Sequence, residues 1–347
     1  MVEWKKLGDV CEVLRGKRLT KSQLSESEGY PVLHGGASPM GYYKDYNRKA
    51  NTTVVVNTGN AGSVFFYDKP FWSSDACYSL YPNKNILDKF LYLYVYGCEP
   101  ILKGKIRAGA MPTIDANAIK TLTIPVPSLE EQNRIVGILD TFTDSIENLK
   151  QQIAQRRKQF EHYRDQLLDL EGKEGVEMIP LKDVADIGTG SSNTNEGLEK
   201  GKYPFYTRGK EVLWKNEYEF DETSIITAGD GVGVGKVFHF VSGKFALHQR
   251  AYRIHIKTEE INPRFIFFYM VSNFEKYIKM KSFFAAVTSV RKPMIFNYPI
   301  PKCTILIQQR IVSILDTFEA SISNLESQLE QRQKQYEYYR NQLLTFE

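Results

Sequence analysis

The residues that most suggest chemistry lie in a glycine-rich stretch from Gly229 to Lys236. Closely spaced glycines can cradle a phosphate group when they follow one of two fixed patterns. The phosphate-loop pattern fails because Asp230 replaces a required glycine and because valine, not serine or threonine, follows Lys236. The dinucleotide pattern fails because its third glycine would fall on Lys236. The stretch therefore predicts a tight turn and not a nucleotide site.

The histidines and cysteines form no catalytic or metal-binding pattern. Their spacings do not match those of zinc or redox motifs. The sequence also lacks the asparagine-proline-proline-aromatic motif of amino-methyltransferases and the phosphate loop of helicases. We therefore predict no catalytic residue and no metal site, and a chain that binds but does not catalyse. The residues considered are His34, His162, His239, His248, His255, Cys11, Cys77, Cys98 and Cys303.

Basic side chains beside polar and aromatic ones are the candidates for binding a partner, because nucleic-acid surfaces have this composition. Residues 1–130 and 172–306 together carry 35 basic and 27 acidic side chains, a surplus of 8 positive charges that suits a polyanion. For any single residue a solvated surface role is the alternative. The predicted DNA-binding residues are Lys17, Arg18, His34, Lys44, Asn57, Asn60, Lys105, Arg107, Arg208, Lys210, His248, Gln249, Arg250, Lys281, Arg291 and Lys292.

The length and hydropathy of the chain limit its class. With 347 residues it has room for two or three domains. The longest run of large apolar residues, 265–271, is far too short to span a bilayer, and the first residues are not those of a secretory signal. Four scattered cysteines are typical of free thiols in a reducing cytosol. We therefore expect a cytoplasmic protein without a membrane partner.

Two closely similar segments are the elements that would position these candidate surfaces. Residues 134–171 and 310–347 align without a gap over 38 residues, and 24 of the aligned positions are identical. Their apolar residues recur in alternating steps of four and three, which is typical of the seam of a left-handed coiled coil. We expect the two helices to pair with each other, antiparallel, within one chain; an amphipathic helix packed on its own domain is the alternative. The predicted seam residues are Ile135, Leu139, Phe142, Ile146, Leu149, Arg156, Ile311, Leu315, Phe318, Ile322, Leu325 and Arg332.

One position of the predicted seam is charged in both copies. Arg156 and Arg332 are equivalent under the repeat. A buried, paired charge in a coiled coil can fix register and partner choice. Alternatively, each guanidinium reaches solvent along its aliphatic stem. The sequence leaves both interpretations open.

The repeat extends into the globular parts. Phe71 matches Phe245 at an offset of 174, and a Pro-x-Pro entry at 125–127 matches one at 299–301, just before each long helix. Apolar β-branched runs bounded by glycine and asparagine predict strands and hairpins. The predicted fold class is α+β: two similar mixed α/β domains separated by two long antiparallel helices that form a coiled coil, with a pseudo-two-fold internal repeat. The predicted boundaries are 1–128 and 172–304 for the domains, and 129–171 and 305–347 for the long helices.

This architecture resembles the specificity subunit of type I restriction-modification systems, and the likeness covers the whole chain. It implies that 1–128 and 172–304 are target recognition domains, and that the long helices are the central and distal conserved regions. The segments that carry the resemblance are 132–136 with 138–140 and 309–312 with 314–316, each after a Pro-x-Pro entry.

The resemblance also implies a function and a set of partners. Each recognition domain would read one half of a split site in double-stranded DNA. The helices would set the spacer and dock two modification subunits, which bring S-adenosylmethionine and methylate adenine. Restriction and motor subunits can join such a complex. The chain itself would be a non-catalytic DNA-recognition subunit that binds no cofactor.

A function of a different class remains open from the residues alone. A coiled-coil scaffold or a dimerising adaptor without DNA readout would use the same helices, but it would need no basic surfaces. Binding to DNA in the presence of the modification subunit distinguishes the two hypotheses.

Overall fold

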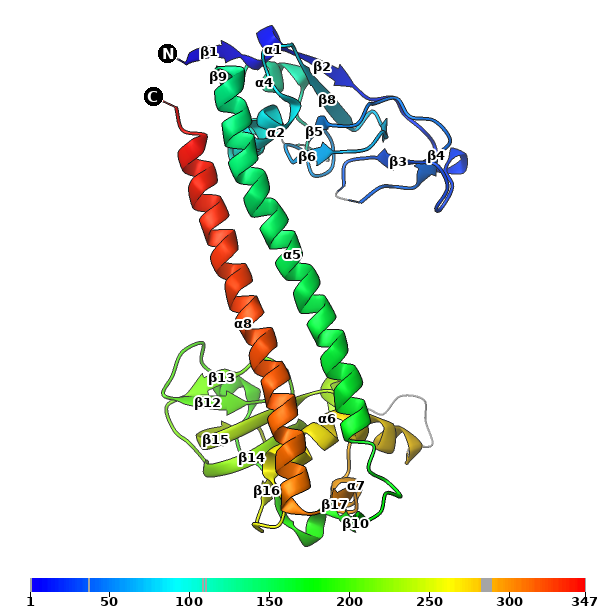
Figure 1. The fold of residues 1–347 in the computed structure, drawn as a ribbon, viewed down its shortest axis with the longest axis vertical. Helices are drawn as coiled ribbons and strands as arrows, with labels where there is room; N and C mark the ends of the chain where they lie inside the picture. The colour runs from blue at the N-terminus through cyan, green and yellow to red at the C-terminus, as the bar shows by residue number, and fades with distance from the viewer. Residues whose placement is uncertain (1, 37, 108, 110, 282–288, 347) are drawn as a thin grey trace. The chain divides into compact units, whose positions relative to one another are not determined.

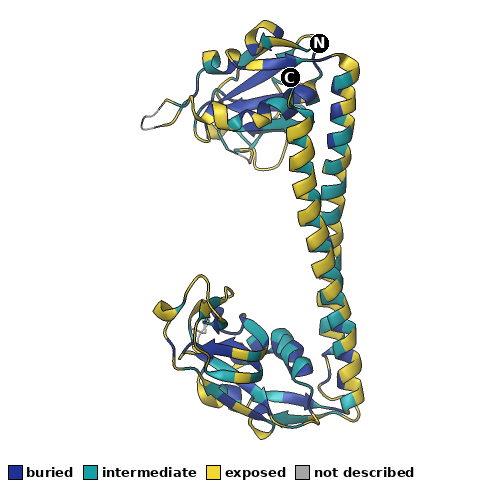
Figure 2. Ribbon diagram, turned by 90° about the vertical axis from the view of Figure 1, so that its left-hand side faces the viewer, coloured by how far each residue is buried: buried dark blue, intermediate teal, exposed yellow. Residues whose placement is uncertain are grey.

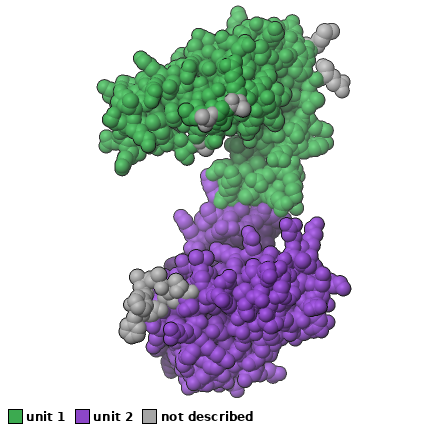
Figure 3. All heavy atoms as spheres, turned by 180° about the vertical axis from the view of Figure 1, so that it is seen from behind, with its two compact units in different colours: residues 1–150, 328–347 green, residues 151–327 purple. Residues whose placement is uncertain are grey.

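The structure is a computed structural model that describes residues 2–36, 38–107, 109, 111–281 and 289–346. It divides into two compact units (Figure 3): unit 1 comprises Met1–Lys150 and Gln328–Glu347, and unit 2 comprises Gln151–Ser327. Each unit contains one globular part and a portion of both long helices, which Figure 1 labels α5 and α8. We call the globular parts of units 1 and 2 the first and the second domain.

The first domain is built around a four-stranded sheet in the order β2-β8-β5-β6, beside a three-stranded sheet in the order β4-β3-β7. All five residues of the central strand β5 are buried, and their β-branched side chains suit that position. Its elements are β1 (Glu3–Lys6), α1 (Leu7–Val10), β2 (Cys11–Arg15), η1 (Lys21–Gln23), β3 (Tyr30–Leu33), β4 (Tyr42–Tyr43), β5 (Thr52–Val56), β6 (Val64–Tyr67), β7 (Trp72–Ser73), β8 (Cys77–Pro82), α2 (Asp88–Gly97), α3 (Glu99–Lys103), α4 (Ala116–Lys120) and β9 (Thr123–Val126).

The second domain has one six-stranded sheet in the order β11-β16-β14-β15-β12-β13. Its helix α6 contributes seven buried residues to the core. The elements are β10 (Glu177–Pro180), η2 (Leu181–Asp183), β11 (Ala185–Thr189), η3 (Thr194–Glu196), β12 (Tyr203–Tyr206), β13 (Leu213–Lys215), β14 (Phe220–Ala228), η4 (Gly231–Gly233), β15 (Phe238–Leu247), β16 (Ala251–Ile256), α6 (Pro263–Met280), α7 (Lys292–Phe296) and β17 (Pro299–Lys302).

The two domains share one strand order. They differ by one break, which divides the sheet of the first domain into two sheets. The strands β2-β8-β5-β6 followed by β7-β3-β4 reproduce the order of the second domain, with the long strand β15 divided into β6 and β7. The division falls at Pro70, which has no backbone N–H to donate. The matching position 174 residues later is Lys244, which pairs with Asp221 of β14. The structure thus contains the two similar mixed α/β domains that the internal repeat predicts.

Both long helices have 39 residues: α5 runs from Leu129 to Leu167 and α8 from Ile305 to Leu343. The two helices end at Leu167 and Leu343. The predicted helical segments end four residues later, at 171 and 347. The last apolar residues, Leu168 and Leu344 among them, continue beyond the helices and pack on the core of a domain. No helix among the residues that the structure describes is long and apolar enough to cross a membrane.

Each unit joins the start of one long helix to the end of the other. In unit 1, Ile135 and Leu139 of α5 are buried in the first core, against which Tyr336 and Leu343 of α8 pack. In unit 2, the equivalent residues of α8 lie in the second core, against which Phe160 and Leu167 of α5 pack. In Figure 2 many residues of the strands are buried, and much of the surface of the long helices is exposed. The same junction therefore occurs twice.

Candidate nucleic-acid interface

The second domain brings two of the predicted DNA-binding residues together around an acid. Arg208 follows β12, Asp230 follows β14, and Arg250 lies in the turn between β15 and β16. Arg208 Nη1 donates to Asp230 Oδ1 at 2.7 Å, and Arg250 Nη1 donates to Asp230 Oδ2 at 3.1 Å. The side chains of Arg208 and Arg250 are 39% and 62% exposed, whereas that of Asp230 is 25% exposed. One carboxylate therefore holds two accessible arginines, and we call these three residues the arginine clamp.

The buried side chain of His248 contacts the backbone of this cluster. Its Nδ1 accepts a hydrogen bond from the backbone N–H of Arg250 at 3.0 Å. Burial lowers the pKa of His248, and the positive charge of Arg208 lowers it further. Burial raises the pKa of Asp230, but the hydrogen bonds from both arginines outweigh this effect, so its pKa lies below the usual value. At neutral pH the histidine is uncharged and the aspartate is ionised.

The glycine-rich stretch is what brings Asp230 to the arginines. A Cβ at Gly229 would lie 2.7 Å from the carbonyl oxygen of Arg250, and one at Gly233 would lie 2.3 Å from that of Arg208. Neither position has room for a side chain, so the turn can approach both backbones closely. Gly231 has a φ of 79°, which favours glycine. The stretch acts as a close-packed turn.

The corresponding place in the first domain has different side chains. Strand register makes Thr58 equivalent to Asp230, because Val56 pairs with Cys77 as Ala228 pairs with Ala251. Thr58 Oγ1 donates to Asn57 Oδ1 at 2.6 Å. Nearby, His34 Nδ1 and Ser74 Oγ lie 2.8 Å apart. These four side chains form a polar cluster. None of them belongs to an arginine or a carboxylate, so they form no arginine–carboxylate pair.

Apart from His34, Asn57 and His248, which belong to the two clusters described above, the other predicted residues are distributed over both domains and join neither cluster. Arg107 forms an ion pair with Asp115 at 2.5 Å. The ammonium group of Lys292 lies 4.9 Å from the ring centroid of Phe296. Asn57 is buried, so its side chain positions the turn. The predicted residues that are exposed are Lys17, Arg18, His34, Lys44, Asn60, Lys105, Arg107, Lys210, Gln249, Arg250, Lys281, Arg291 and Lys292.

A buried glutamine fastens the first domain to its helix. Gln132, in the first turn of α5, is 0% exposed. Its Oε1 accepts a hydrogen bond from the backbone N–H of Leu87 at 2.8 Å. Its Nε2 donates to the carbonyl oxygens of Asn85 and Pro127 at 2.8 and 2.9 Å. One side chain therefore ties the helix to the loop before α2 and to the Pro-x-Pro entry.

The second domain repeats this arrangement with Gln308, which is also 0% exposed. Its Oε1 accepts from the backbone N–H of Asn262 at 2.8 Å, and its Nε2 donates to the carbonyl oxygens of Glu260 and Cys303 at 2.9 and 2.8 Å. Asn262 in turn caps α6. We call Gln132 and Gln308 the junction glutamines.

About two turns further along each long helix, an ion pair also links the helix to its domain. In the first domain, Lys89 Nζ lies 3.3 Å from Asp140 Oδ1 and 5.0 Å from the ring centroid of Phe66. In the second, Arg264 Nε lies 3.0 Å from an oxygen of Asp316. Its guanidinium lies 5.0 Å from the ring centroid of the phenylalanine at 240, which matches Phe66 at an offset of 174. The same carboxylate–cation–aromatic contact therefore holds each domain to its own helix.

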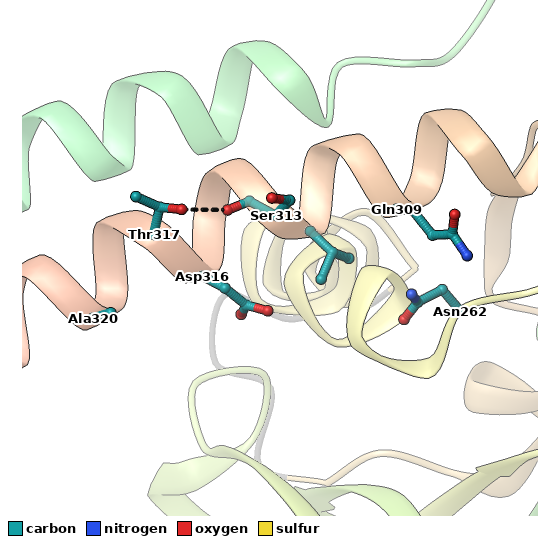
Figure 4. A pocket seen from close by; sticks show the side chains of 7 residues that line it. Asn262, Gln309, Ser313, Asp316, Thr317 and Ala320 are labelled. Atoms are coloured by element: carbon teal, nitrogen blue, oxygen red, sulfur yellow. Dashed lines mark hydrogen bonds between the residues drawn. The ribbon is translucent and has the colours of Figure 1, made fainter.

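The outer face of α8 beside this ion pair is open. A hollow of about 530 Å³ lies there, lined by residues that include Asn262 and Asp316. Figure 4 shows the lining side chains, with Gln309 and Ala320 at opposite ends of the group. Thr317 Oγ1 donates to the Ser313 carbonyl oxygen at 2.7 Å, which keeps that side chain on its own helix. The hollow is part of the junction. The residues that line it form no cluster of the kind that binds a metal.

The seam arginines lie over aromatic rings of the other helix. In unit 1 the guanidinium of Arg332 lies 5.6 Å from the ring centroid of Phe142, and Tyr339 stacks on that ring at 5.3 Å. In unit 2 Arg156 lies 5.8 Å from the ring centroid of Phe318, which stacks with Tyr163 at 5.5 Å. Cation–π contacts of this kind let a charge lie over apolar surface without full burial. Of the predicted seam residues, Ile135, Leu139, Ile311 and Leu315 are buried, and Phe142, Ile146, Leu149, Arg156, Phe318, Ile322, Leu325 and Arg332 are half-buried.

A family model described as "Type I restriction modification DNA specificity domain" matches residues 1–156 and 173–333, once for each half of the repeat. The chain belongs to this type I specificity family. A putative type I restriction enzyme specificity subunit from Haemophilus influenzae is 27% identical, and the match covers 99% of this chain and 96% of that one. The EcoR124I/EcoR124II specificity subunit of Escherichia coli is also 27% identical, with 99% and 94% covered. These matches confirm the family expected from the sequence and, with it, a function in DNA specificity.

Solved structures share the fold of this specificity chain. The S subunit of a type I system from M. genitalium superposes with a TM-score of 0.72 at 18% identity and covers 100% of this chain and 97% of that one. A chain from a structure on complex assembly and conformational transition of the type I restriction-modification system gives a TM-score of 0.61 at 17% identity, with 99% and 96% covered. At such identities the likeness shows the fold.

Sequence reasoning missed two features of the specificity chain. Asp230 was excluded as part of a phosphate loop, and an acid among basic candidates gave no signal of its own. The junction glutamines lie just before the repeat as it was delimited, at the same offset of 176, so extending the alignment by two residues would have found them. Within the part of the chain that the structure describes, no cluster of histidine, cysteine and acidic residues is arranged to hold a metal.

Proposed function

We propose that this chain reads a bipartite site in double-stranded DNA, with one half-site for each domain. One observation carries the proposal: a single strand scaffold occurs twice and presents different polar clusters at corresponding positions. The second domain presents the arginine clamp, and the first presents His34 and Thr58, with Thr58 bonded to the buried Asn57 and no charged pair among them. Polar side chains of different type read different base edges. A shared scaffold with unlike clusters therefore suits two different half-sites.

We further propose that α5 and α8 form an antiparallel coiled coil that sets the spacer between the half-sites. Within unit 1 the early residue Phe142 of α5 meets the late residue Tyr339 of α8. Within unit 2 the late residue Tyr163 of α5 meets the early residue Phe318 of α8. Opposite chain directions are the arrangement that satisfies both contacts. Equal lengths of 39 residues support a role as a ruler.

The helices also suit the docking of two copies of one partner. Several exposed positions are identical in both copies, including Thr141 with Thr317 and Lys158 with Lys334. Seam packing does not explain these identities, because the residues lie off the seam. Two modification subunits, carrying S-adenosylmethionine for adenine methylation, are the partners that the proposal requires, and restriction and motor subunits can join them. This chain would then be the non-catalytic reader, in the cytoplasm where the DNA is.

The test exchanges one reader. Residues 1–139 are replaced by the corresponding part of another family member, so that the junction glutamine travels with its domain. The chimera is assembled with the modification subunit, and methylated adenines are mapped across a genome. One half of the methylated site should change and the other half should stay.

A simultaneous change of both half-sites would contradict the two-reader arrangement. Binding that does not weaken as salt is raised would also contradict it, because lysine and arginine contacts to phosphates release counterions. Binding to the modification subunit without any DNA readout would instead support the scaffold hypothesis.

A further inference from the structure

The arginine clamp has the geometry of a built recognition site. Both guanidiniums are fixed from one side by Asp230, at 2.7 and 3.1 Å, while they remain 39% and 62% exposed on the other. An arginine offers five N–H donors in a planar fork, and each bond to Asp230 uses one of them. Donors on both side chains are therefore directed by the carboxylate and available to a ligand.

The carboxylate also narrows the chemistry of that ligand. A phosphate group brings negative charge, and the ionised Asp230 between the arginines would repel it. A base edge carries uncharged acceptors, which the carboxylate repels much less than it repels a phosphate anion. Guanine presents two acceptors side by side in the major groove, O6 and N7, and the fork of an arginine matches this pair. Because Asp230 already fixes the arginine side chains, less conformational entropy is lost when they bind a base.

We infer that Arg208 and Arg250, held by Asp230, read guanine in the half-site of the second domain. This inference rests on the proposed function and adds the base that this domain recognises. Val232, at the tip of the adjoining turn, is 100% exposed.

The first domain lacks this reader at the same place. Strand register places Gly35, Thr58 and Ala76 where the second domain has Arg208, Asp230 and Arg250. None of these three side chains can present a guanidinium. The inference therefore predicts that the clamp governs one half-site alone.

The experiment uses the full complex of this chain with its modification subunit. Methylated sites of the wild type are mapped first, and duplexes that differ by one base pair in the second half-site are then compared for binding. Arg250→Ala should reduce the preference for guanine at one base pair by roughly 5- to 150-fold, the range expected for a bidentate contact. The half-site of the first domain should stay unchanged.

Two further variants separate base reading from simple attraction. Arg250→Lys keeps the charge but loses the fork, so it should relax the same base pair while binding to unrelated DNA is retained. Asp230→Asn keeps the size of the side chain but frees both arginines, so it should relax that base pair and strengthen binding to unrelated DNA.

Lys257→Ala is the matched control, because it removes one positive charge from an exposed residue at the other end of β16 from Arg250. About six strand residues, or roughly 20 Å, separate the two. Its base preference should match that of the wild type.

The inference is overturned if Arg250→Ala and Arg250→Lys weaken all sequences equally and leave base preference intact, since that describes a phosphate contact. It is also overturned if the second half-site contains no guanine whose identity these variants relax. Thermal unfolding of each variant shows whether its domain is folded, and Arg250→Lys stays informative because the side chain is largely exposed. A wild-type complex without any sequence preference would instead refute the proposed function.

Discussion

At the scale of single residues, each junction contains one fully buried glutamine whose side chain bonds only to the backbone in the contacts described above. Each junction glutamine forms hydrogen bonds with three backbone groups. A buried amide in such a place specifies orientation as well as stability, because its donor and acceptor must both find partners. Its neighbour in the chain can differ entirely in importance: Gln308 is 0% exposed, while Gln309 lies at the surface.

Gln308→Met should lower the free energy of unfolding of unit 2 by roughly 2–4 kcal/mol, because it leaves one backbone N–H and two carbonyl oxygens without their partner. Gln309→Met, one residue away on the exposed face, should change stability by less than about 0.5 kcal/mol. Urea unfolding of both variants provides the comparison. Equal stability of the two would show that the glutamine contacts contribute little.

At the scale of elements, the seam of the long helices rests on a repeated aromatic sandwich. Phe142 lies between Arg332 and Tyr339, and Phe318 lies between Arg156 and Tyr163. This arrangement favours the second interpretation of the seam arginines, in which the charge lies over apolar surface and reaches solvent. Phe142→Ala and Phe318→Ala should each destabilise the protein, by about 2–4 kcal/mol, through lost burial and lost ring contacts.

The measurement is denaturant unfolding of the two variants beside Gln335→Ala, which alters an exposed position of α8. The two phenylalanine variants should resemble each other more than either resembles the control. A large difference between the two would mean that the sandwiches are unequal despite their matching contacts.

The helices and strands also show how much of the fold can be predicted from the sequence. The period of the seam predicted both helices, because a step near 3.5 residues leaves few other structures open. Their ends were misplaced by four residues, since Leu168 and Leu344 continue the apolar pattern but pack on a domain core. Landmarks such as Phe71 and Phe245 predicted the repeat of the domains. The arginine clamp could not be predicted from the sequence, because its three residues come from three separate turns that only the folded chain brings together.

At the scale of the whole molecule, the proposed ruler can be lengthened without disturbing either junction. Seven residues of helix-forming, seam-matched sequence are inserted after Lys150 in α5 and after Ser327 in α8, at the boundaries of the two units. Seven residues lengthen a helix by about 10 Å, which corresponds to about three base pairs. Methylation at sites with the original spacer should be lost, and the remaining methylation should fall at a longer spacer with the same half-sites.

Affinity at the new spacer should be reduced, because about three base pairs turn the second half-site by roughly 100° around the duplex. Mapping of methylated adenines is the readout. The same insertion in α5 alone is the control, and it should abolish assembly because the seams no longer match. Retained methylation at the original spacer would show that the helices do not set the distance.

The junction glutamines have a consequence for how genes of this kind can change. Each one lies in the first turn of its helix, so a genetic crossover further along the helix transmits a domain together with the residues that orient it. The two helical segments share 24 of 38 positions, and exchange between them preserves the spacing of the apolar stripe. We therefore expect that new combinations of half-sites can arise by recombination in a single event that leaves the glutamine contacts between each domain and the start of its own helix intact.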